Sequence, residues 1–462
     1  MMPLGLTHAD GSPYQSLSTH AGNPLLISLD WLVDRGWLEQ DIWEKAEDNS
    51  QWRFETLARG CMNALEVIDD HTRADFQRFV RGQDYWLDDY AKFVVLKKLE
   101  HGASWVDWPE KLRRHNAAAI DAALKNYQHE IELRKFEQYL FFRQWRELRK
   151  FAHQHGVYMF GDLPIFVSRD SADVWAQREN FTVDEHGNGT VVAGVPPDAF
   201  SDDGQLWGNP LFDWPTHKIS DFSWWLDRLR THFSLFDIIR IDHFRGLEAC
   251  WEVPATSPTA KDGEWVKAPG AELLLKIQQH FSNMPLVAED LGIITPEVEQ
   301  LRQQFSLPGM KVLQFAFDGD YGNHHLPHNH SEDMVVYTGT HDNDTSVSWY
   351  NSADDNTKKQ LCEYLECGDH DMPWPLMRSA MMSVAKTAIF PMQDVLGLGA
   401  GHRMNLPGTV EGNWQWRFDW SQVDGDLAGR LRELTGRYSR VAPEGPIEEL
   451  GNKWPEVDRR RN

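Results

Sequence analysis

Hydrophobic and polar residues follow two different periods along this chain. Between residues 41 and 150, aromatic and aliphatic side chains recur every three or four positions among charged ones, as in the segment 136–151. This spacing places the apolar side chains on one face of a helix. After Gly156 come short apolar runs that end in a polar residue and precede a helix-like segment, which is typical of the βα units of a parallel sheet. We therefore predict a mainly helical subdomain over 24–150 and an α/β catalytic region over 151–462.

The apolar runs of the second region are candidate strands, and each leads to a carboxylate. The runs and their acids are 157–160 with Asp162, 235–241 with Asp242, 286–288 with Glu289, 312–317 with Asp318, 334–337 with Asp342, and 388–392 with Asp394. Amphipathic segments between them, which we predict to be helices, are 222–233, 271–281 and 296–305.

This rhythm predicts the fold class. In a (β/α)8 barrel every strand points its C-terminal end at the same face, so acids that are distant in sequence converge there. We predict an α/β fold of the TIM-type (β/α)8 barrel class with helical and loop insertions, including an active-site loop insertion at about 170–220. An open doubly wound sheet is the alternative, because it also gathers strand ends in a crevice.

Composition narrows the class of protein. Of the 462 residues, 41% are hydrophobic and 25% are charged, as in ordinary globular proteins and unlike disordered, fibrous or membrane proteins. The 46 basic and 70 acidic side chains give a formal net charge of −24. Nucleic acids and anionic membranes need a concentrated positive surface, so we expect neither as a partner. The 21 tryptophans suit protein cores, interfaces and the faces of sugars alike.

The cysteines and the N-terminal segment bear on location. Cys61, Cys250, Cys362 and Cys367 form neither a C-x-x-C pair nor a dense disulfide pattern, which favours a reducing compartment. The first 16 residues lack a basic region followed by an apolar stretch, and no later segment is apolar over the length of a membrane span. We therefore expect a cytoplasmic protein.

Asp242 is the first candidate catalytic acid. It lies in the sequence Ile-Arg-Ile-Asp-His-Phe-Arg-Gly at 239–246, among apolar positions and potential cations. Opposite charges would lower the pKa of Asp242 and keep its carboxyl group ionised. An ionised and oriented carboxylate is what a nucleophile in sugar chemistry requires. A buried ion-pair cluster that closes a strand is the alternative interpretation.

Glu289 is the second candidate, in the sequence Val-Ala-Glu-Asp-Leu-Gly at 287–292. Burial and the neighbouring charge of Asp290 would raise the pKa of Glu289 toward that of a general acid. The alternative is that Asp290 caps a helix and Glu289 is merely adjacent to it.

Asp342 is the third candidate, in the sequence Thr-Gly-Thr-His-Asp-Asn-Asp-Thr at 338–345. A calcium loop does not fit, because Ser346 and Val347 stand where an EF-hand needs an acid or amide and a glycine. Ligands for sugar hydroxyls fit better, and a turn or cap is the alternative. One ionised and one protonated carboxyl, with a third acid on the sugar hydroxyls, meet the requirements of glycoside chemistry. We predict a separation of ~5–5.5 Å between the carboxyl groups of Asp242 and Glu289, as in retaining enzymes.

Three further motifs are predicted to be turns or loops. The sequence Gly-Leu-Gly-Ala-Gly at 397–401 is predicted to be a turn, because His402 stands where a dinucleotide motif needs a glycine. His324, His325, His328 and His330 have no accompanying cysteine, so we expect a solvated loop and no metal site. The Gly/Pro-rich segment 194–210 is predicted to be a loop that covers a bound chain, or one that Trp207 anchors to the core.

Together these segments resemble the 4-α-glucanotransferases of glycoside hydrolase family 77, also called amylomaltases or disproportionating enzymes, within the α-amylase superfamily. The resemblance covers essentially the whole chain. Its motifs are Ser-Pro-Tyr-Gln-Ser at 12–16, Ala-Gly-Asn-Pro-Leu at 21–25, Gly-Asp-Leu-Pro-Ile-Phe at 161–166, the segments 194–210, 239–246, 288–292 and 338–345, Arg-Met-Asn at 403–405 and Gly-Asn-Trp at 412–414.

The resemblance implies roles for individual residues. Asp242 matches the family's nucleophile, Glu289 its acid/base and Asp342 its transition-state stabiliser. Arg240 and His341 match the positions that orient the nucleophile and bind the donor sugar. Further contacts on the donor side are implied for Tyr14, Asp162 and Asn405, and contacts near the acceptor side and its covering loop for Asp198, Gln205, Trp207 and Phe315.

The resemblance also implies the reaction. We expect retaining transfer of α-1,4-glucan segments between malto-oligosaccharide donors and acceptors, with glucose as a further acceptor, through a covalent glucosyl-enzyme. No metal or organic cofactor is expected. An α-glucan hydrolase with the same acids, or an inactive glucan-binding protein, is the alternative. Family members begin with a further strand and helix, so residues 1–23 are expected to start the barrel at its second strand, with the first βα unit missing.

Overall fold

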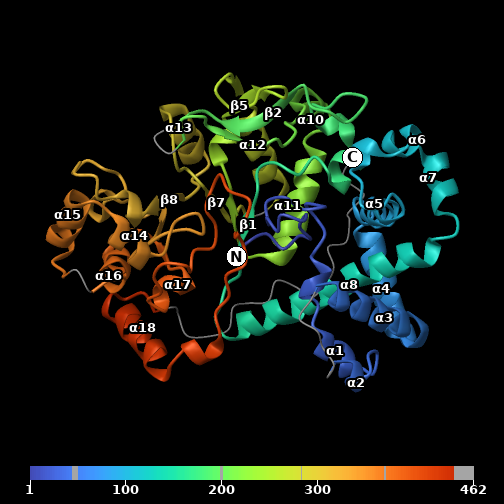
Figure 1. Ribbon diagram of the computed structural model, residues 1–462, viewed down its shortest axis with the longest axis horizontal. Coiled ribbons are helices and arrows are strands. Elements are labelled where there is room, and N and C mark those ends of the chain that lie inside the picture. Colours follow the sequence, from blue (N-terminus) through green and yellow to red (C-terminus); the bar gives the residue numbers. More distant parts are fainter. Residues whose placement is uncertain (44–49, 198–200, 282, 369–370, 442–462) are drawn as a thin grey trace.

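The computed structural model describes residues 1–43, 50–197, 201–281, 283–368 and 371–441. It is a mixed α/β fold in which the helices of residues 29–154 lie to one side of a group of central parallel strands, and an antiparallel sheet lies across one end (Figure 1). Among the described helices, none is both long enough and apolar enough to cross a membrane.

In the described part of the chain, six parallel strands form two three-stranded sheets, in the orders β1-β4-β7 and β8-β9-β10. The first sheet pairs Asp162 with Arg240 and Arg240 with Val287. The backbone N–H of Ala288 donates to Pro308 O at 2.8 Å, so β7 adjoins the start of β8. The bounds are β1 Phe160–Leu163, β4 Ile238–Ile241, β7 Leu286–Ala288, β8 Gly309–Val312, β9 Met334–Tyr337 and β10 Thr387–Ile389.

The predicted strands are confirmed in part. The runs 286–288 and 334–337 coincide with β7 and β9. The run 157–160 is wrong except for its last residue, and Asp162 lies within β1 and not after it. The prediction for 235–241 is wrong at its start, because Leu235 belongs to the preceding helix. The prediction for 312–317 is also wrong: the strand ends at Val312, and a 3-10 turn at Leu313–Phe315 follows it.

The helices between the central strands lie close to their predicted positions, at α11 Ser223–Leu235, α12 Gly270–His280 and α13 Pro296–Gln304. Pro296 stands at the start of α13, where its missing N–H leaves no unpaired donor, and Glu297 and Glu299 lie in the first turn. The remaining helices of this half are α9 Ala172–Ala176, α10 Trp214–Ile219, α14 Ser346–Ser352, α15 Asp355–Leu365, α16 Trp374–Met382, α17 Met392–Val395 and α18 Gly425–Arg437.

An antiparallel sheet corrects the prediction for 194–210. This segment is not a loop throughout: it supplies the end of β2 Val191–Val195 and all of β3 Gln205–Leu206. The sheet order is β3-β2-β5-β6, with β5 at Ala249–Pro254 and β6 at Glu264–Lys267. A side chain at Gly194 would place its Cβ 2.7 Å from Gln205 O, so glycine lets the two strands approach.

Residues 41–150 are largely helical where they are described, as the three- and four-residue period predicts. The longest of the described helices, α8, buries Phe136, Tyr139 and Leu140 along one face. Its Trp145 Nε1 donates to Leu235 O at 2.8 Å, which ties the helices to α11 and the central strands. The bounds are α1 Leu29–Val33, α2 Gln40–Trp43, α3 Ser50–Val67, α4 Asp70–Gly82, α5 Leu87–Leu99, α6 Glu110–Arg113, α7 Ala117–Leu124 and α8 Gln128–Gln154.

The prediction of a solvated loop for the histidine-rich segment is confirmed only in part, because His324 and His328 are exposed whereas His325 and His330 are buried. The backbone N–H of Val312 donates to His325 Nδ1 at 3.2 Å, and His330 Nδ1 lies 2.7 Å from Ser383 Oγ. Within the described parts of the chain, no group of three or more metal-ligating side chains is clustered.

Candidate active site

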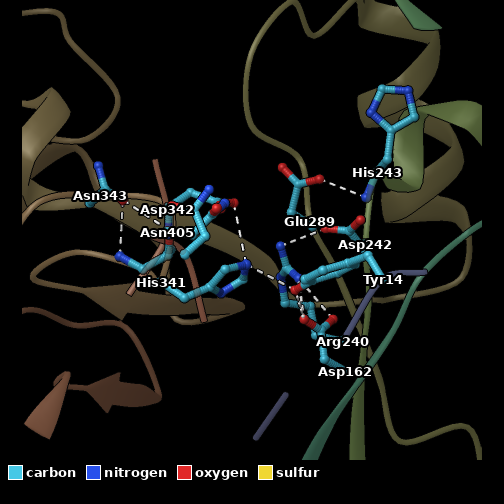
Figure 2. A network of polar contacts seen from close by, with 12 residues as sticks. Tyr14, Asp162, Arg240, Asp242, His243, Glu289, His341, Asp342, Asn343 and Asn405 are labelled. Carbon is cyan, nitrogen blue, oxygen red and sulfur yellow. Dashed lines mark hydrogen bonds and ion pairs between the residues drawn. The ribbon is translucent and has the colours of Figure 1, made fainter. Parts of the chain in front are cut away.

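The parallel strands bring the predicted catalytic acids to one face of the molecule (Figure 2). Asp242 follows β4, Glu289 follows β7, and Asp342 lies between β9 and α14. The strand ladder continues to the first two acids, since Asp242 N donates to Leu163 O at 2.9 Å and Glu289 N to Ile241 O at 3.0 Å. The backbone at these two acids is therefore held in register by the sheet.

Arg240 aims the carboxylate of Asp242. Its Nη1 donates to both oxygens of Asp162 at 2.7 Å, and its Nη2 donates to Asp242 Oδ1 at 2.8 Å. The side chains of Arg240 and Asp162 are 9% and 7% exposed, whereas that of Asp242 is 26% exposed. The contact with Asp162 therefore holds the Arg240 guanidinium in place, and Asp242 is the more exposed of the three side chains, facing the open site.

The sequence-based expectation that Asp242 has a lowered pKa is wrong. Burial raises the pKa of Asp242 well above its usual range; Arg240 opposes this shift, and the nearby carboxylates of Asp162, Glu289 and Asp342 add to it. Two of the potential cations do not reach it. Burial lowers the pKa of His243 to about 3, and Arg245 donates to Ile293 O and lies over the ring of Trp265.

Glu289 has a different environment from Asp242. Its Oε2 accepts a hydrogen bond from His243 N at 2.6 Å, and its Oε1 accepts one from Leu291 N at 2.9 Å. Burial raises the pKa of Glu289, with a contribution from the charge of Asp290, as the sequence predicts. Asp290 does not cap a helix: its Oδ1 accepts from Met310 N at 2.6 Å.

Asp342 lies in a third environment. Its Oδ1 accepts from Asn405 Nδ2 at 2.6 Å, and its Oδ2 lies 3.3 Å from His341 Nε2. Burial alone would raise the pKa of Asp342, but the bonds to His341 and Asn405 and the charge of Arg240 lower it to about 2. The Asp342 side chain is 42% exposed, so an ionised carboxylate faces the site.

Tyr14 connects the two sides of the site. Its hydroxyl donates to Asp162 Oδ2 at 2.5 Å and lies 2.9 Å from His341 Nε2. The rings of Tyr14 and His341 stack with centroids 5.5 Å apart. A continuous chain of polar contacts therefore runs from Asp342 through His341, Tyr14 and Asp162 to Arg240 and Asp242 (Figure 2).

The residues predicted near the acceptor side lie apart from this chain of contacts. Trp207 packs edge-on against His243, with centroids 4.8 Å apart, and its Nε1 donates to Gln205 Oε1 at 3.1 Å. Phe315 lies in the turn after β8, with its ring 5.6 Å from that of His325. Asp198 lies outside the described residues.

Sequence reasoning named no role for three residues that contact the site. Trp414 lies 5.8 Å from both Tyr14 and His341, measured between ring centroids. Arg403 Nη2 donates to Asp342 O at 2.5 Å. Asp394 holds both ends of the segment that carries His341 and Asp342. Trp414 and Arg403 belong to motifs of the resemblance, and Asp394 ends an apolar run, so each had a signal in the sequence.

Comparison with known proteins shows the family to which this chain belongs. Residues 1–422 match the model of glycoside hydrolase family 77, described as 4-alpha-glucanotransferase. The chain belongs to this family. It is 46% identical to a 4-alpha-glucanotransferase of Thermus thermophilus over 96% of this chain and 91% of that protein. It is 44% identical to a 4-alpha-glucanotransferase of Synechocystis sp. over 95% of this chain and 90% of that protein.

Solved structures support the fold. An amylomaltase from Streptococcus agalactiae in complex with acarbose superposes with a TM-score of 0.91 at 34% identity, covering 95% of this chain and 91% of that one. The amylomaltase of Corynebacterium glutamicum has the same fold, with a TM-score of 0.72 at 18% identity, over 96% of this chain and 68% of that one. The family activity is 4-α-glucanotransfer on α-1,4-glucans, which makes this chain a glycosyltransferase of carbohydrate metabolism.

Proposed function

We propose that this chain transfers segments of α-1,4-glucan between malto-oligosaccharides, and to glucose, by a retaining mechanism on Asp242, Glu289 and Asp342. The main observation behind the proposal is that the Arg240 guanidinium bonds to Asp162 through one nitrogen and to Asp242 through another, which leaves Asp242 facing the open site. We call this pair of contacts the Arg240 fork. The malto-oligosaccharide substrate is supported by the family and by the acarbose complex of the Streptococcus agalactiae structure.

The first step needs one ionised and one protonated acid. Burial and mutual repulsion favour a single proton shared between Asp242 and Glu289. Attack on the anomeric carbon requires the form in which Glu289 holds this proton, and the guanidinium that bonds to Asp242 stabilises the charge of Asp242 in that form. Glu289 then protonates the glycosidic oxygen while Asp242 attacks the anomeric carbon, which forms a β-linked glucosyl ester and releases the reducing-end fragment.

The second step returns the α-linkage. The 4-hydroxyl of an acceptor glucan attacks the anomeric carbon of the ester, Glu289 takes the hydroxyl proton, and the bond from that carbon to Asp242 breaks to release the carboxylate. Asp342 remains ionised because of its low pKa, and its charge stabilises the oxocarbenium-like transition states of both steps. We assign His341, Tyr14, Asp162 and Asn405 to the donor sugar, and Gln205, Trp207 and Phe315 to the acceptor side.

We also propose the barrel architecture for this site. The six parallel strands follow the order β1, β4, β7, β8, β9 and β10, with helices between them, as in the wall of a (β/α)8 barrel. Residues 24–150 then form the helical subdomain, 151–462 the catalytic region, and about 170–220 the insertion over the active face. The free cysteines support a cytoplasmic location.

Maltotriose tests the proposed function. We expect the wild-type protein to give glucose and a ladder of longer oligosaccharides with no net gain of reducing ends. Asp242→Asn should abolish the ladder while the protein remains folded. Asp318→Asn is the control, because this exposed acid bonds to Asp320 N and Asn323 and not to the site. Products without longer oligosaccharides would indicate a hydrolase, and no turnover would indicate a binding protein.

A second experiment tests the covalent step. Glu289→Gln keeps the hydrogen-bonding shape but removes the acid/base, so an activated donor such as maltosyl fluoride should form the ester faster than it is consumed. Peptide mass spectrometry should then locate one maltosyl group on Asp242. A label on another residue, or none under conditions where fluoride is released, would contradict the retaining mechanism on Asp242.

A further inference from the structure

The segment 338–346 carries His341 and Asp342, and it is held at both ends by one buried carboxylate, Asp394. At the first end, Thr338 Oγ1 donates to Asp394 Oδ2 at 2.6 Å. At the other end, Ser346 N donates to Oδ1 at 2.8 Å and Ser346 Oγ donates to Oδ2 at 2.7 Å. Asp394 comes from α17, after β10, so the two ends are joined through a neighbouring element and not through their own strand and helix.

The cost of burying Asp394 argues that the carboxylate has a purpose. Thr338, Ser346 and Asp394 are each 0% exposed. The partners that the described structure shows for Asp394 are two hydroxyls and one amide, all uncharged, and the nearby Asp344 repels it. A buried carboxylate without an ion pair is strongly disfavoured relative to one in water, unless hydrogen bonds offset the lost hydration. An apolar residue would fill the same space at lower cost, but it would leave the segment ends untied.

The contacts around Ser346 determine the direction of its side-chain hydrogen bond to Asp394. Gln314 Nε2 donates to Asp344 O at 2.9 Å and approaches Ser346 Oγ at 3.4 Å. The Ser346 oxygen therefore accepts from the amide and directs its own proton to Asp394. Inside the segment, Thr340 N and Thr340 Oγ1 both donate to Asn343 Oδ1, at 2.9 and 3.0 Å, which closes the turn beside Asp342. With both ends held by Asp394, this turn has little freedom to shift.

We propose that Asp394 is a positioning residue of the transfer reaction, which sets the depth of His341 and Asp342 in the site by tying Thr338 to Ser346. This inference rests on the proposed role of Asp342. The interaction of Asp342 with the sugar ring strengthens as the ring flattens, so a displaced segment weakens transition-state binding more than substrate binding. The signature is a fall in kcat with little change in KM.

Asp394→Asn tests the inference, since it keeps the shape and replaces one acceptor oxygen by a donor. We expect kcat on maltotriose to fall about 100-fold, the cost of a misplacement of about 1 Å, while KM changes by less than about threefold. Thr338→Val removes a single donor and should lower kcat about tenfold. Thr338→Ser retains the hydroxyl and should restore kcat to within about twofold.

A double-mutant cycle separates positioning from general destabilisation. With maltosyl fluoride as the donor, Asp394→Asn should lower the rate of fluoride release clearly less in an Asp342→Asn background than in the wild type, because the charge of Asp342 is already gone and only His341 remains to be displaced. Asp237→Asn is the matched control: this buried carboxylate lies before β4 and bonds to Arg149 and His153. It should lower the melting temperature without changing kcat.

Distinct results contradict the inference and the proposed function. A wild-type kcat in Asp394→Asn or Thr338→Val, or an undiminished effect of Asp394→Asn in the Asp342→Asn background, would overturn the positioning role. If Asp394→Asn does not fold, the Thr338→Val and Thr338→Ser pair decides the question. An active Asp342→Asn single variant would instead remove the proposed role of Asp342.

Discussion

The orientation of the Asp242 carboxylate depends on which neighbouring cation contacts it. Arg240, His243 and Arg245 all lie near it in sequence, yet only Arg240 contacts its carboxylate. Alternation along a strand explains this choice, because residues two apart project on the same face and Arg240 precedes Asp242 by two. His243 has left β4 with a left-handed φ of 52°, which turns the chain away. Strand alternation could therefore have singled out Arg240, whereas the burial that raises the pKa of Asp242 required the folded structure.

Arg240→Lys tests the fork at this scale. Lysine keeps the charge but cannot bond to Asp162 and Asp242 with the planar geometry of a guanidinium. We expect kcat on maltotriose to fall about 100-fold through misplacement of the nucleophile, with a smaller change in KM. Arg245→Lys is the control, because Arg245 bonds to Ile293 O and lies 3.6 Å from the ring centroid of Trp265. Equal losses of kcat in the two variants would contradict a specific role for the fork.

At the scale of elements, the sequence predicts strands best where an apolar run is bounded by polar residues or proline. Pro285 and Glu289 bound β7, and Asp333 and Thr338 bound β9, so both strands lie where they are expected. The run 235–241 merges the last turn of α11 with β4, since an apolar helix end and an apolar strand share one composition. The pairing of β2 with β5 depends on residues about 60 apart and has no local signal.

The histidine-rich segment gives a prediction about acid stability. Burial lowers the pKa of His325 to about 3, while the unfolded chain has a value near 6.5. Above pH 6.5 both states are neutral. Between the two values only the unfolded state binds the proton, so the free energy of unfolding falls as the pH falls, by about 1.4 kcal/mol per unit at most.

His325→Asn removes this titration and retains an acceptor for Val312 N. Its deficit in unfolding free energy relative to the wild type should shrink by about 1.4 kcal/mol between pH 7.5 and pH 5.5, as measured by urea unfolding. Asn329→Ala, in the same segment, removes no titratable group, so its difference from the wild type should stay constant with pH. A constant difference for His325→Asn would show that His325 takes up its proton equally in both states.

At the scale of the molecule, the site joins parts of the chain that local sequence cannot bring together. Tyr14 comes from the N-terminal segment, the acids from the ends of the parallel strands, and Asn405 and Trp414 from the segment after α17. The alternation of apolar runs and acids predicts convergence at one face, and the family resemblance adds Tyr14 and Asn405. The antiparallel sheet that brings Trp207 against His243 emerges only from the folded chain.

The position of Trp207 leads to a prediction about the balance between transfer and hydrolysis. Trp207 follows β3, and its ring packs against His243, the residue after the proposed nucleophile, so we expect this ring to bind an acceptor sugar and displace water. The Trp207→Ala variant should therefore hydrolyse a larger share of the glucan that it cleaves. A loss of about 1.4 kcal/mol of acceptor binding would raise the hydrolysed share of turnovers about tenfold. Net reducing ends formed per glucose released from maltotriose measure that share, because transfer conserves reducing ends. Trp265→Ala is the control, since Trp265 lies in the same sheet on Arg245 and should leave the share unchanged. An unchanged share in Trp207→Ala, or an equal rise in both variants, would mean that water is excluded by some other part of the fold.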